Sequence, residues 1–117
     1  MQLREVDFAE ATPIEGYGPG FFRIGGQAVT APLCVTAKGA RAWGGYEDAQ
    51  VLLDLVGEID VIFIGTGPET THMPAELRDQ LDEAGIGVEV MNSPAACRTY
   101  NVLLSEGRRV AAALLPV

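Results

Sequence analysis

The chain has 117 residues, of which 16 are acidic and eight are basic, so its net charge is −8. This charge repels nucleic-acid backbones and anionic membrane surfaces, and we expect neither as a partner. No apolar run approaches the roughly 20 residues of a membrane-spanning helix, and the first residues are acidic and polar rather than those of a signal peptide. We therefore expect no stable membrane insertion, a cytoplasmic location and one domain over residues 1–117.

The cysteine and histidine content argues against a metal or disulfide framework. Cys34 and Cys97 are too few for a disulfide scaffold and lack the spacing of metal ligands, so we expect two reduced thiols. His72 is the single histidine, which leaves little for a zinc site or a Ser-His-Asp triad. The sequence predicts no metal and no cofactor.

The first half of the chain predicts extended structure. Residues 1–20 contain several prolines and glycines and are expected to form an extended lead-in that ends in a sharp turn. The Gly25-Gly26 pair tolerates the positive φ values of a tight turn, so Phe21–Ile24 and Gln27–Val29 are predicted to pair as a β-hairpin. Leu33–Thr36 is predicted to be a short buried strand.

The second half alternates between helices and strands. The predicted elements are a helix over Glu47–Val56, a strand over Val61–Ile64, a helix opened by Pro74 and stopped by Gly85, a strand over Val88–Met91, a helix over Ser93–Ser105 and a strand over Val110–Leu115. This order predicts parallel β-α-β crossovers and a sheet with helices on its faces, which is an α/β fold.

The helix over Ser93–Ser105 carries the densest chemistry of the chain. Ser93 is expected to cap the helix, and Pro94 suits its first position because that amide has no helical partner. The helix starts where the preceding strand ends, and ligands of open α/β sheets gather at that edge. Free amides there favour an anion, whereas simple capping is the alternative interpretation.

Three side chains further along this helix have two interpretations each. Cys97 is predicted to be a small buried side chain rather than a nucleophile, because no base accompanies it in the sequence. Arg98 and Asn101 lie three residues apart and offer a forked cation and an amide, which suit a carboxylate, a phosphate or exposed backbone. They are equally suited to fastening neighbouring loops.

The loop that follows the Val61–Ile64 strand should lie at the same edge of the sheet. Gly65 and Gly67 permit close backbone approach, and Thr66 begins a series of hydroxyls. The loop lacks the lysine and the spacing of a phosphate-binding loop, so a plain turn rich in hydroxyls is the competing interpretation.

An aromatic pair marks the candidate interaction patch. Phe21 and Phe22 are adjacent in a predicted strand, so one should enter the core while the other faces outward beside Tyr17. Such a group suits an apolar contact patch for a protein partner, and coverage by the N-terminal lead-in is the equally open alternative.

Three stretches of the sequence resemble one known family. They are Gly16–Ile24, the Gly65-Thr66-Gly67 sequence after its apolar strand, and Met91–Leu103 followed by Glu106-Gly107-Arg108. They are similar to the domain-of-unknown-function family numbered 498, which includes Mth938-domain proteins and a mitochondrial assembly factor of respiratory complex I. The resemblance implies a three-layer α/β domain with a mixed central sheet. It also implies no established reaction for bacterial members and a non-catalytic chaperone role for the mitochondrial one.

Two hypotheses follow for this chain, for which we expect no mitochondrial targeting sequence and a bacterial origin. The first is a non-catalytic protein-binding or assembly module that uses an exposed sheet edge or the Tyr17–Phe22 patch. The alternative is a small-anion-binding protein or enzyme with its site between the Gly65–Thr71 loop and the Ser93 helix. The candidate binding residues are Gly65, Thr66, Gly67, Ser93, Arg98, Thr99, Tyr100 and Asn101, with no catalytic residue assigned.

Overall fold

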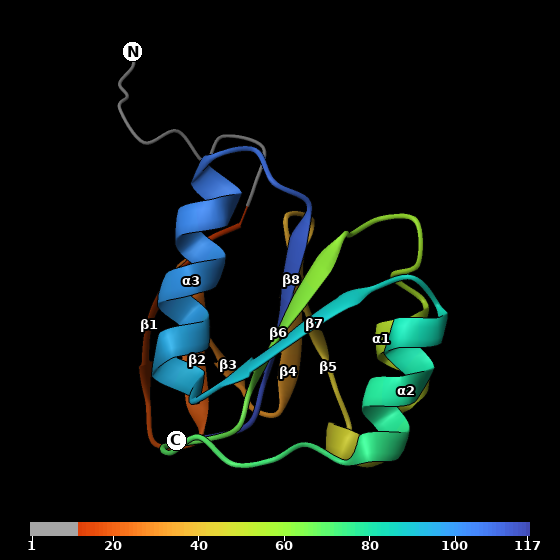
Figure 1. Ribbon diagram of the computed structural model, residues 1–117. Helices are drawn as coiled ribbons and strands as arrows, with labels where there is room; N and C mark the ends of the chain where they lie inside the picture. The colour runs from red at the N-terminus through yellow and green to blue at the C-terminus, as the bar shows by residue number, and fades with distance from the viewer. Residues whose placement is uncertain (1–11) are drawn as a thin grey trace.

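Residues 12–117, the part of the chain that the computed structural model describes, build two β-sheets and three α-helices (Figure 1). The antiparallel sheet has the order β1 (Ile14–Gly18), β2 (Phe21–Ile24), β3 (Gln27–Thr30). The mixed sheet has the order β5-β4-β8-β6-β7, from β4 (Leu33–Thr36), β5 (Gly39–Ala42), β6 (Val61–Gly65), β7 (Gly87–Met91) and β8 (Val110–Leu114). The helices are the 3-10 turn η1 (Gly45–Glu47), α1 (Ala49–Leu53), α2 (Ala75–Glu83) and α3 (Ser93–Ser105).

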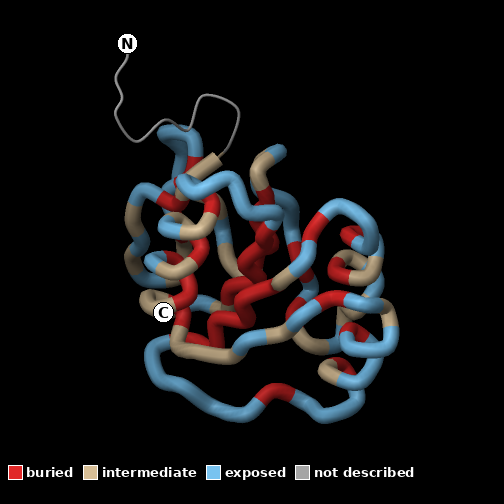
Figure 2. The backbone as a smooth tube through the Cα atoms, turned by 45° about the horizontal axis from the view of Figure 1, so that its top comes forward, coloured by how far each residue is buried: buried red, intermediate tan, exposed pale blue. Residues whose placement is uncertain are grey.

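The mixed sheet is covered on both faces, as predicted. Figure 1 shows α3 on one side of it and α1 with α2 on the other. Successive residues of β6 serve the two cores, since Phe63 packs on the α3 side and Ile62 and Ile64 on the α1–α2 side. Buried residues accordingly run through the centre of the molecule in Figure 2. None of the helices between residues 12 and 117 is long and apolar enough to span a membrane.

The predicted hairpin is present, and the described part of the predicted lead-in is extended and ends in a sharp turn, but it also pairs as a strand, which the sequence does not predict. Gly25 and Gly26 have φ values of 61° and 79°, and β2 and β3 pair across them. β1 pairs antiparallel with β2 through a tight turn in which Gly20 has a φ of 78°. This turn reverses the chain, so the segment before it becomes a third strand. The first eleven residues of the lead-in lie outside the described part.

The helix predicted over Glu47–Val56 is interrupted at Asp48. Asp48 has φ −107° and ψ 67°, which is not helical, and separates η1 from α1. Two bonds hold it there: its carboxylate accepts from the Gly44 amide at 2.9 Å, and its carbonyl accepts from Trp43 Nε1 at 3.0 Å. An amphipathic pattern in the sequence does not show this competition for the Asp48 backbone.

Parallel pairing brings the two candidate segments together. β6 and β7 run parallel, with Gly65 opposite Met91. The loop after Gly65 and the start of α3, two residues after Met91, therefore meet at one edge of the sheet.

Candidate functional site

Ser93 lies fully buried where the loop after β6 meets α3. Its hydroxyl accepts from the Gly67 amide at 2.9 Å and donates to the Leu115 carbonyl at 2.8 Å. Its own amide donates to the Gly67 carbonyl at 2.8 Å. Ser93 therefore links three segments by hydrogen bonds, namely the loop after β6, the start of α3 and the residues that follow β8.

Asn92, not Ser93, caps α3. The Asn92 side chain accepts from the Ala95 amide at 2.8 Å, and Asn92 has the extended backbone of an N-cap, with φ −65° and ψ 159°. The prediction that Ser93 caps the helix is wrong because the Ser93 hydroxyl is already engaged with Gly67 and Leu115. Pro94 accordingly stands one position later in the helix than predicted.

The first turn of α3 offers no free amide. Ser93 donates to Gly67, Ala95 to the Asn92 side chain and Ala96 to the Asn92 carbonyl at 2.9 Å, while Pro94 has no N–H. An anion at a helix N-terminus is bound by such amides. The arrangement therefore lacks the donors that the anion interpretation of this helix end requires.

The glycines of the loop serve close packing within the chain. A Cβ atom at Gly65 would lie 2.8 Å from Ser93 Oγ and 2.9 Å from the Ser93 Cα atom. Gly67 has a φ of 104°, and a Cβ there would lie 3.3 Å from the Pro116 carbonyl oxygen. Both glycines let the loop approach α3 and the end of the chain.

Thr66 closes its own loop and is only 8% exposed. Its hydroxyl donates to the Glu69 carbonyl at 2.6 Å and accepts from the Thr71 amide at 3.1 Å. Thr71 lines a hollow with His72 and Arg78. None of the hollows described for residues 12–117 contains both this loop and Arg98.

Tyr100 and Asn101 hold the start of β1. The buried Tyr100 donates its hydroxyl to the Thr12 carbonyl at 2.8 Å. The Asn101 amide accepts from the Ile14 N–H at 2.9 Å and donates to the Ile14 carbonyl at 2.7 Å. Asn101 thus pairs with Ile14 as a neighbouring strand would, and the interpretation of Asn101 as a fastening residue agrees with these bonds.

Arg98 stands apart from these side chains. It is exposed, and no hydrogen bond or ion pair joins it to another residue of the range 12–117. It lines a hollow of about 180 Å³ between α3 and β1, where Tyr17 and Glu15 also lie. It also lines a second hollow, of about 280 Å³, together with Thr99, Val102 and Leu103.

We call Tyr17, Arg98, Thr99, Val102 and Leu103 the Arg98 surface, because both hollows meet at Arg98. Of the predicted aromatic patch, Tyr17 alone is largely exposed, at 49%. Phe22 is fully buried, Phe21 is half-buried, and the rings of Tyr17 and Phe22 lie 6.2 Å apart.

Both cysteines are free and buried. Burial raises the pKa of Cys97 from 9.0 to about 12, against the smaller opposing effect of the Arg98 charge. Burial likewise raises the pKa of Cys34 to about 12. A nucleophilic cysteine requires the opposite shift, so Cys97 matches the predicted buried thiol. Between residues 12 and 117, no three acidic, cysteine or histidine side chains gather in a way that could hold a metal ion.

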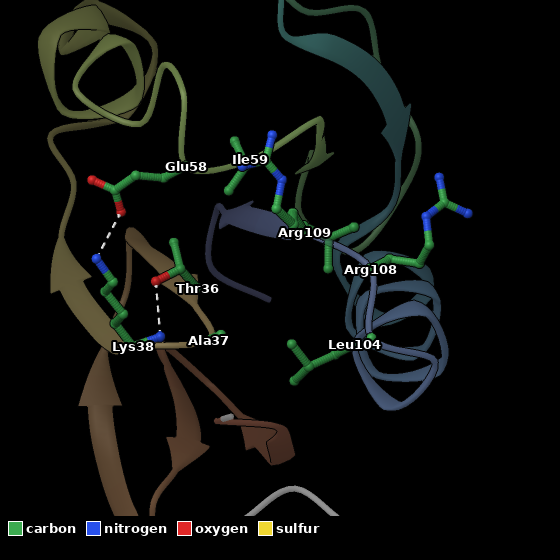
Figure 3. A pocket seen from close by; sticks show the side chains of 10 residues that line it. Thr36, Ala37, Lys38, Glu58, Ile59, Leu104, Arg108 and Arg109 are labelled. Atoms are coloured by element: carbon green, nitrogen blue, oxygen red, sulfur yellow. Dashed lines mark hydrogen bonds and ion pairs between the residues drawn. The ribbon is translucent and has the colours of Figure 1, made fainter. Parts of the chain in front are cut away.

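A larger hollow lies where the sequence pointed to no site. It measures about 330 Å³ and is found at the other end of β8, beside the C-terminus of α3 (Figure 3). Its lining residues are Thr36, Ala37, Lys38, Glu58, Ile59, Leu104, Gly107, Arg108, Arg109 and Val110. Lys38 lies 3.4 Å from Glu58, and Arg109 lies 2.7 Å from Asp60. Arg108 in the Glu106-Gly107-Arg108 sequence is the one signal that could have indicated this hollow.

Comparison with known proteins places the chain in a family. The model of the family described as "Protein of unknown function (DUF498/DUF598)" matches residues 14–115. The chain belongs to this family. An uncharacterised protein of Rhodobacter capsulatus is 47% identical over all of this chain and 94% of that protein. NADH dehydrogenase [ubiquinone] 1 alpha subcomplex assembly factor 3 of Danio rerio is 35% identical over 99% of this chain and 71% of that protein.

Solved structures show the same fold for this DUF498 chain. A Bordetella pertussis protein described as a Mth938-like domain superposes with a TM-score of 0.78 at 26% identity, over 99% of this chain and 92% of that one. A protein of Bartonella henselae superposes with a TM-score of 0.83 at 37% identity, over 95% of this chain and 99% of that one. The latter is described as an outer membrane protein, a statement about that protein alone.

Proposed function

We propose that this DUF498 chain is a single-domain, non-catalytic protein-binding module that assists the assembly of a multisubunit respiratory enzyme of the NADH dehydrogenase type. The observation that carries the proposal is the 35% identity to a complex I assembly factor over 99% of this chain. An identity of this extent covers the fold and the α3 region together, so the relationship concerns the whole unit.

The α3 region supports binding rather than catalysis. The polar groups of Ser93, Tyr100 and Asn101 are bonded to the chain's own backbone, and the Cys97 thiol is buried with a raised pKa. The exposed side chains of α3 include Arg98 and Val102, which suit a protein contact. The proposal places the protein in the cytoplasm of a bacterial cell, where its unpaired cysteines remain reduced.

Deletion of the gene in its host tests the proposed function. We expect the fully assembled NADH dehydrogenase, separated on a native gel and stained for activity, to fall strongly, with partly assembled subcomplexes in its place. The wild-type gene on a plasmid should restore the assembled enzyme, and an unrelated respiratory complex serves as the control. An unchanged amount of assembled NADH dehydrogenase in the deletion strain overturns the proposal.

A further inference from the structure

We infer that the Arg98 surface is the docking site for a partner segment that carries an acidic side chain flanked by apolar side chains. The inference rests on the proposed function, since it names the contact surface and the partner chemistry of the binding module proposed above. Three observations carry it. Apolar side chains are exposed beside Arg98, the Arg98 guanidinium has no acidic partner among residues 12–117, and α2 is acidic whereas α3 is not.

Apolar exposure is concentrated beside Arg98. Among the described residues, the large hydrophobic side chains that are exposed are Tyr17 at 49%, Val56 at 50% and Val102 at 55%. Tyr17 and Val102 line the two hollows that share Arg98. Arg98 and Val102 are four residues apart on α3 and therefore lie on the same side of the helix. The half-buried Leu103 extends the apolar area next to them.

The Arg98 guanidinium has no acidic partner among residues 12–117. Glu15 lines the hollow between α3 and β1, but its carboxylate accepts from the Gly26 amide at 2.9 Å. By contrast, Arg109 is paired with Asp60 and also donates to the Gly57 carbonyl. Within the part of the chain that the structure describes, the guanidinium donors of Arg98 are therefore open to a carboxylate supplied by another molecule.

The charges of α2 and α3 differ in a way that favours α3 as the contact for an acidic segment. The 13 residues of α3 include no aspartate or glutamate, and Arg98 is their single charged side chain. The nine residues of α2, on the opposite face of the sheet, include four exposed acids, namely Glu76, Asp79, Asp82 and Glu83. Like charges across an interface are strongly unfavourable, so an acidic segment is repelled from α2 and tolerated on α3.

The chemistry of the surface fits a short anchor segment. Tyrosine and arginine, together with tryptophan, are the residue types enriched at energetic centres of protein interfaces. The apolar side chains of the partner would cover Tyr17 and Val102, which excludes water and strengthens the pairing of its carboxylate with Arg98. A basic segment would place a like charge beside the Arg98 guanidinium, which is unfavourable.

Site-specific photo-crosslinking in the living host tests the inference. A photo-reactive amino acid is placed in the full chain at Val102 or Tyr17, and as controls at Glu89 on β7 and Asp79 on α2. Mass spectrometry then reads the crosslinked partner peptide. We expect crosslinks from positions 17 and 102 to one partner polypeptide, and we expect the crosslinked peptide to contain aspartate or glutamate among apolar residues.

A charge variant gives the second readout. With the crosslinker at position 102, Arg98→Gln should lower the yield about tenfold or more, whereas Arg78→Gln on α2, the matched control, should leave it unchanged. Circular dichroism confirms that both variants fold. Crosslinks confined to positions 79 or 89, a basic partner peptide, a second copy of this chain as the partner, or an unchanged yield in Arg98→Gln overturns the inference.

The outcomes separate this inference from the proposed function. A partner peptide of the expected composition from a protein outside NADH dehydrogenase supports the docking site and counts against the assembly role. Loss of assembled enzyme in the deletion strain, together with crosslinks only from Glu89, supports the assembly role and overturns the docking site.

Discussion

Polar side chains of α3 differ sharply in what they contact. Ser93 and Asn101 are bonded to backbone groups that lie 22 and 87 residues away in the sequence, at Leu115 and Ile14. Arg98, three residues before Asn101, has no such bond among the described residues. Within one helix, some polar side chains therefore make hydrogen bonds to distant parts of the chain, while a neighbouring cation is exposed.

The buried thiols give a prediction at the scale of single residues. Cys97 and Cys34 have pKa values of about 12 in the folded protein against 9.0 ordinarily, so both remain protonated at pH 8. We expect neither thiol to react with Ellman's reagent at pH 8 in the native protein, and both to react once urea unfolds it. A native thiol that reacts at the rate of free cysteine contradicts this.

The same shifts set a pH dependence. Between pH 9 and about 12 the folded protein binds more protons than the unfolded chain, because folding raises the pKa of both thiols. The contribution of these two thiols to the free energy of unfolding is therefore fully present below pH 9, and it is lost as the pH rises towards 12. Urea titrations at several pH values measure this loss of stability. In Cys97→Ala the loss between pH 9 and 12 should be smaller, because one of the two thiols is absent.

At the scale of elements, the helices differ in how their ends are determined. The bounds of α3 coincide with the predicted Ser93–Ser105 because a polar cap, a proline and the following Gly107 all act locally. The α1 segment is shortened by Asp48, whose backbone and carboxylate contact Trp43 and Gly44 instead. Local signals thus predict a helix correctly unless a residue within it is hydrogen-bonded to groups outside the helix, as Asp48 is.

The Asn92 cap gives a prediction for α3. Asn92→Ala leaves the Ala95 amide without its acceptor and should lower the free energy of unfolding by about 1 kcal/mol. Asn92→Asp keeps the acceptor and adds a negative charge at the positive end of the helix dipole, so it should preserve stability. Urea unfolding of the three proteins measures the difference. Equal stability of Asn92→Ala and the wild type would show that the bond contributes nothing.

At the scale of the whole molecule, α3 joins the two sheets. Its inner side chains Ala96, Tyr100 and Leu104 share one core with Phe22 of the three-stranded sheet and Phe63 of the mixed sheet. The bonds from Tyr100 and Asn101 then attach the beginning of β1 to the helix. Tyr17 on β1 and Arg98 on α3 line one hollow between these two attached elements.

Asn101→Asp tests the attachment of β1. The carboxylate keeps an acceptor for the Ile14 amide but places an oxygen against the Ile14 carbonyl, which loses its donor. We expect the free energy of unfolding to fall by about 1–3 kcal/mol and the exchange of β1 amides to accelerate. Thr99→Ala, on the outer side of the same helix, should change stability by less than about 0.5 kcal/mol. Unaltered exchange at Ile14 would contradict the role of Asn101.

Periodicity, glycine turns and helix signals act over a few residues, so the sequence alone predicts the α/β alternation, the β2–β3 hairpin and the α3 bounds. The family follows separately, from motifs that resemble those of its members. The folded chain alone shows that β1 pairs with β2, that Asn92 rather than Ser93 caps α3, and that the candidate residues separate into hydrogen-bonded and exposed groups. Those outcomes depend on hydrogen bonds between residues far apart in the chain, such as Ser93 with Leu115. A local sequence pattern does not contain the distant partner of such a bond. The sequence therefore could not separate the exposed Arg98 from the hydrogen-bonded side chains of the same helix.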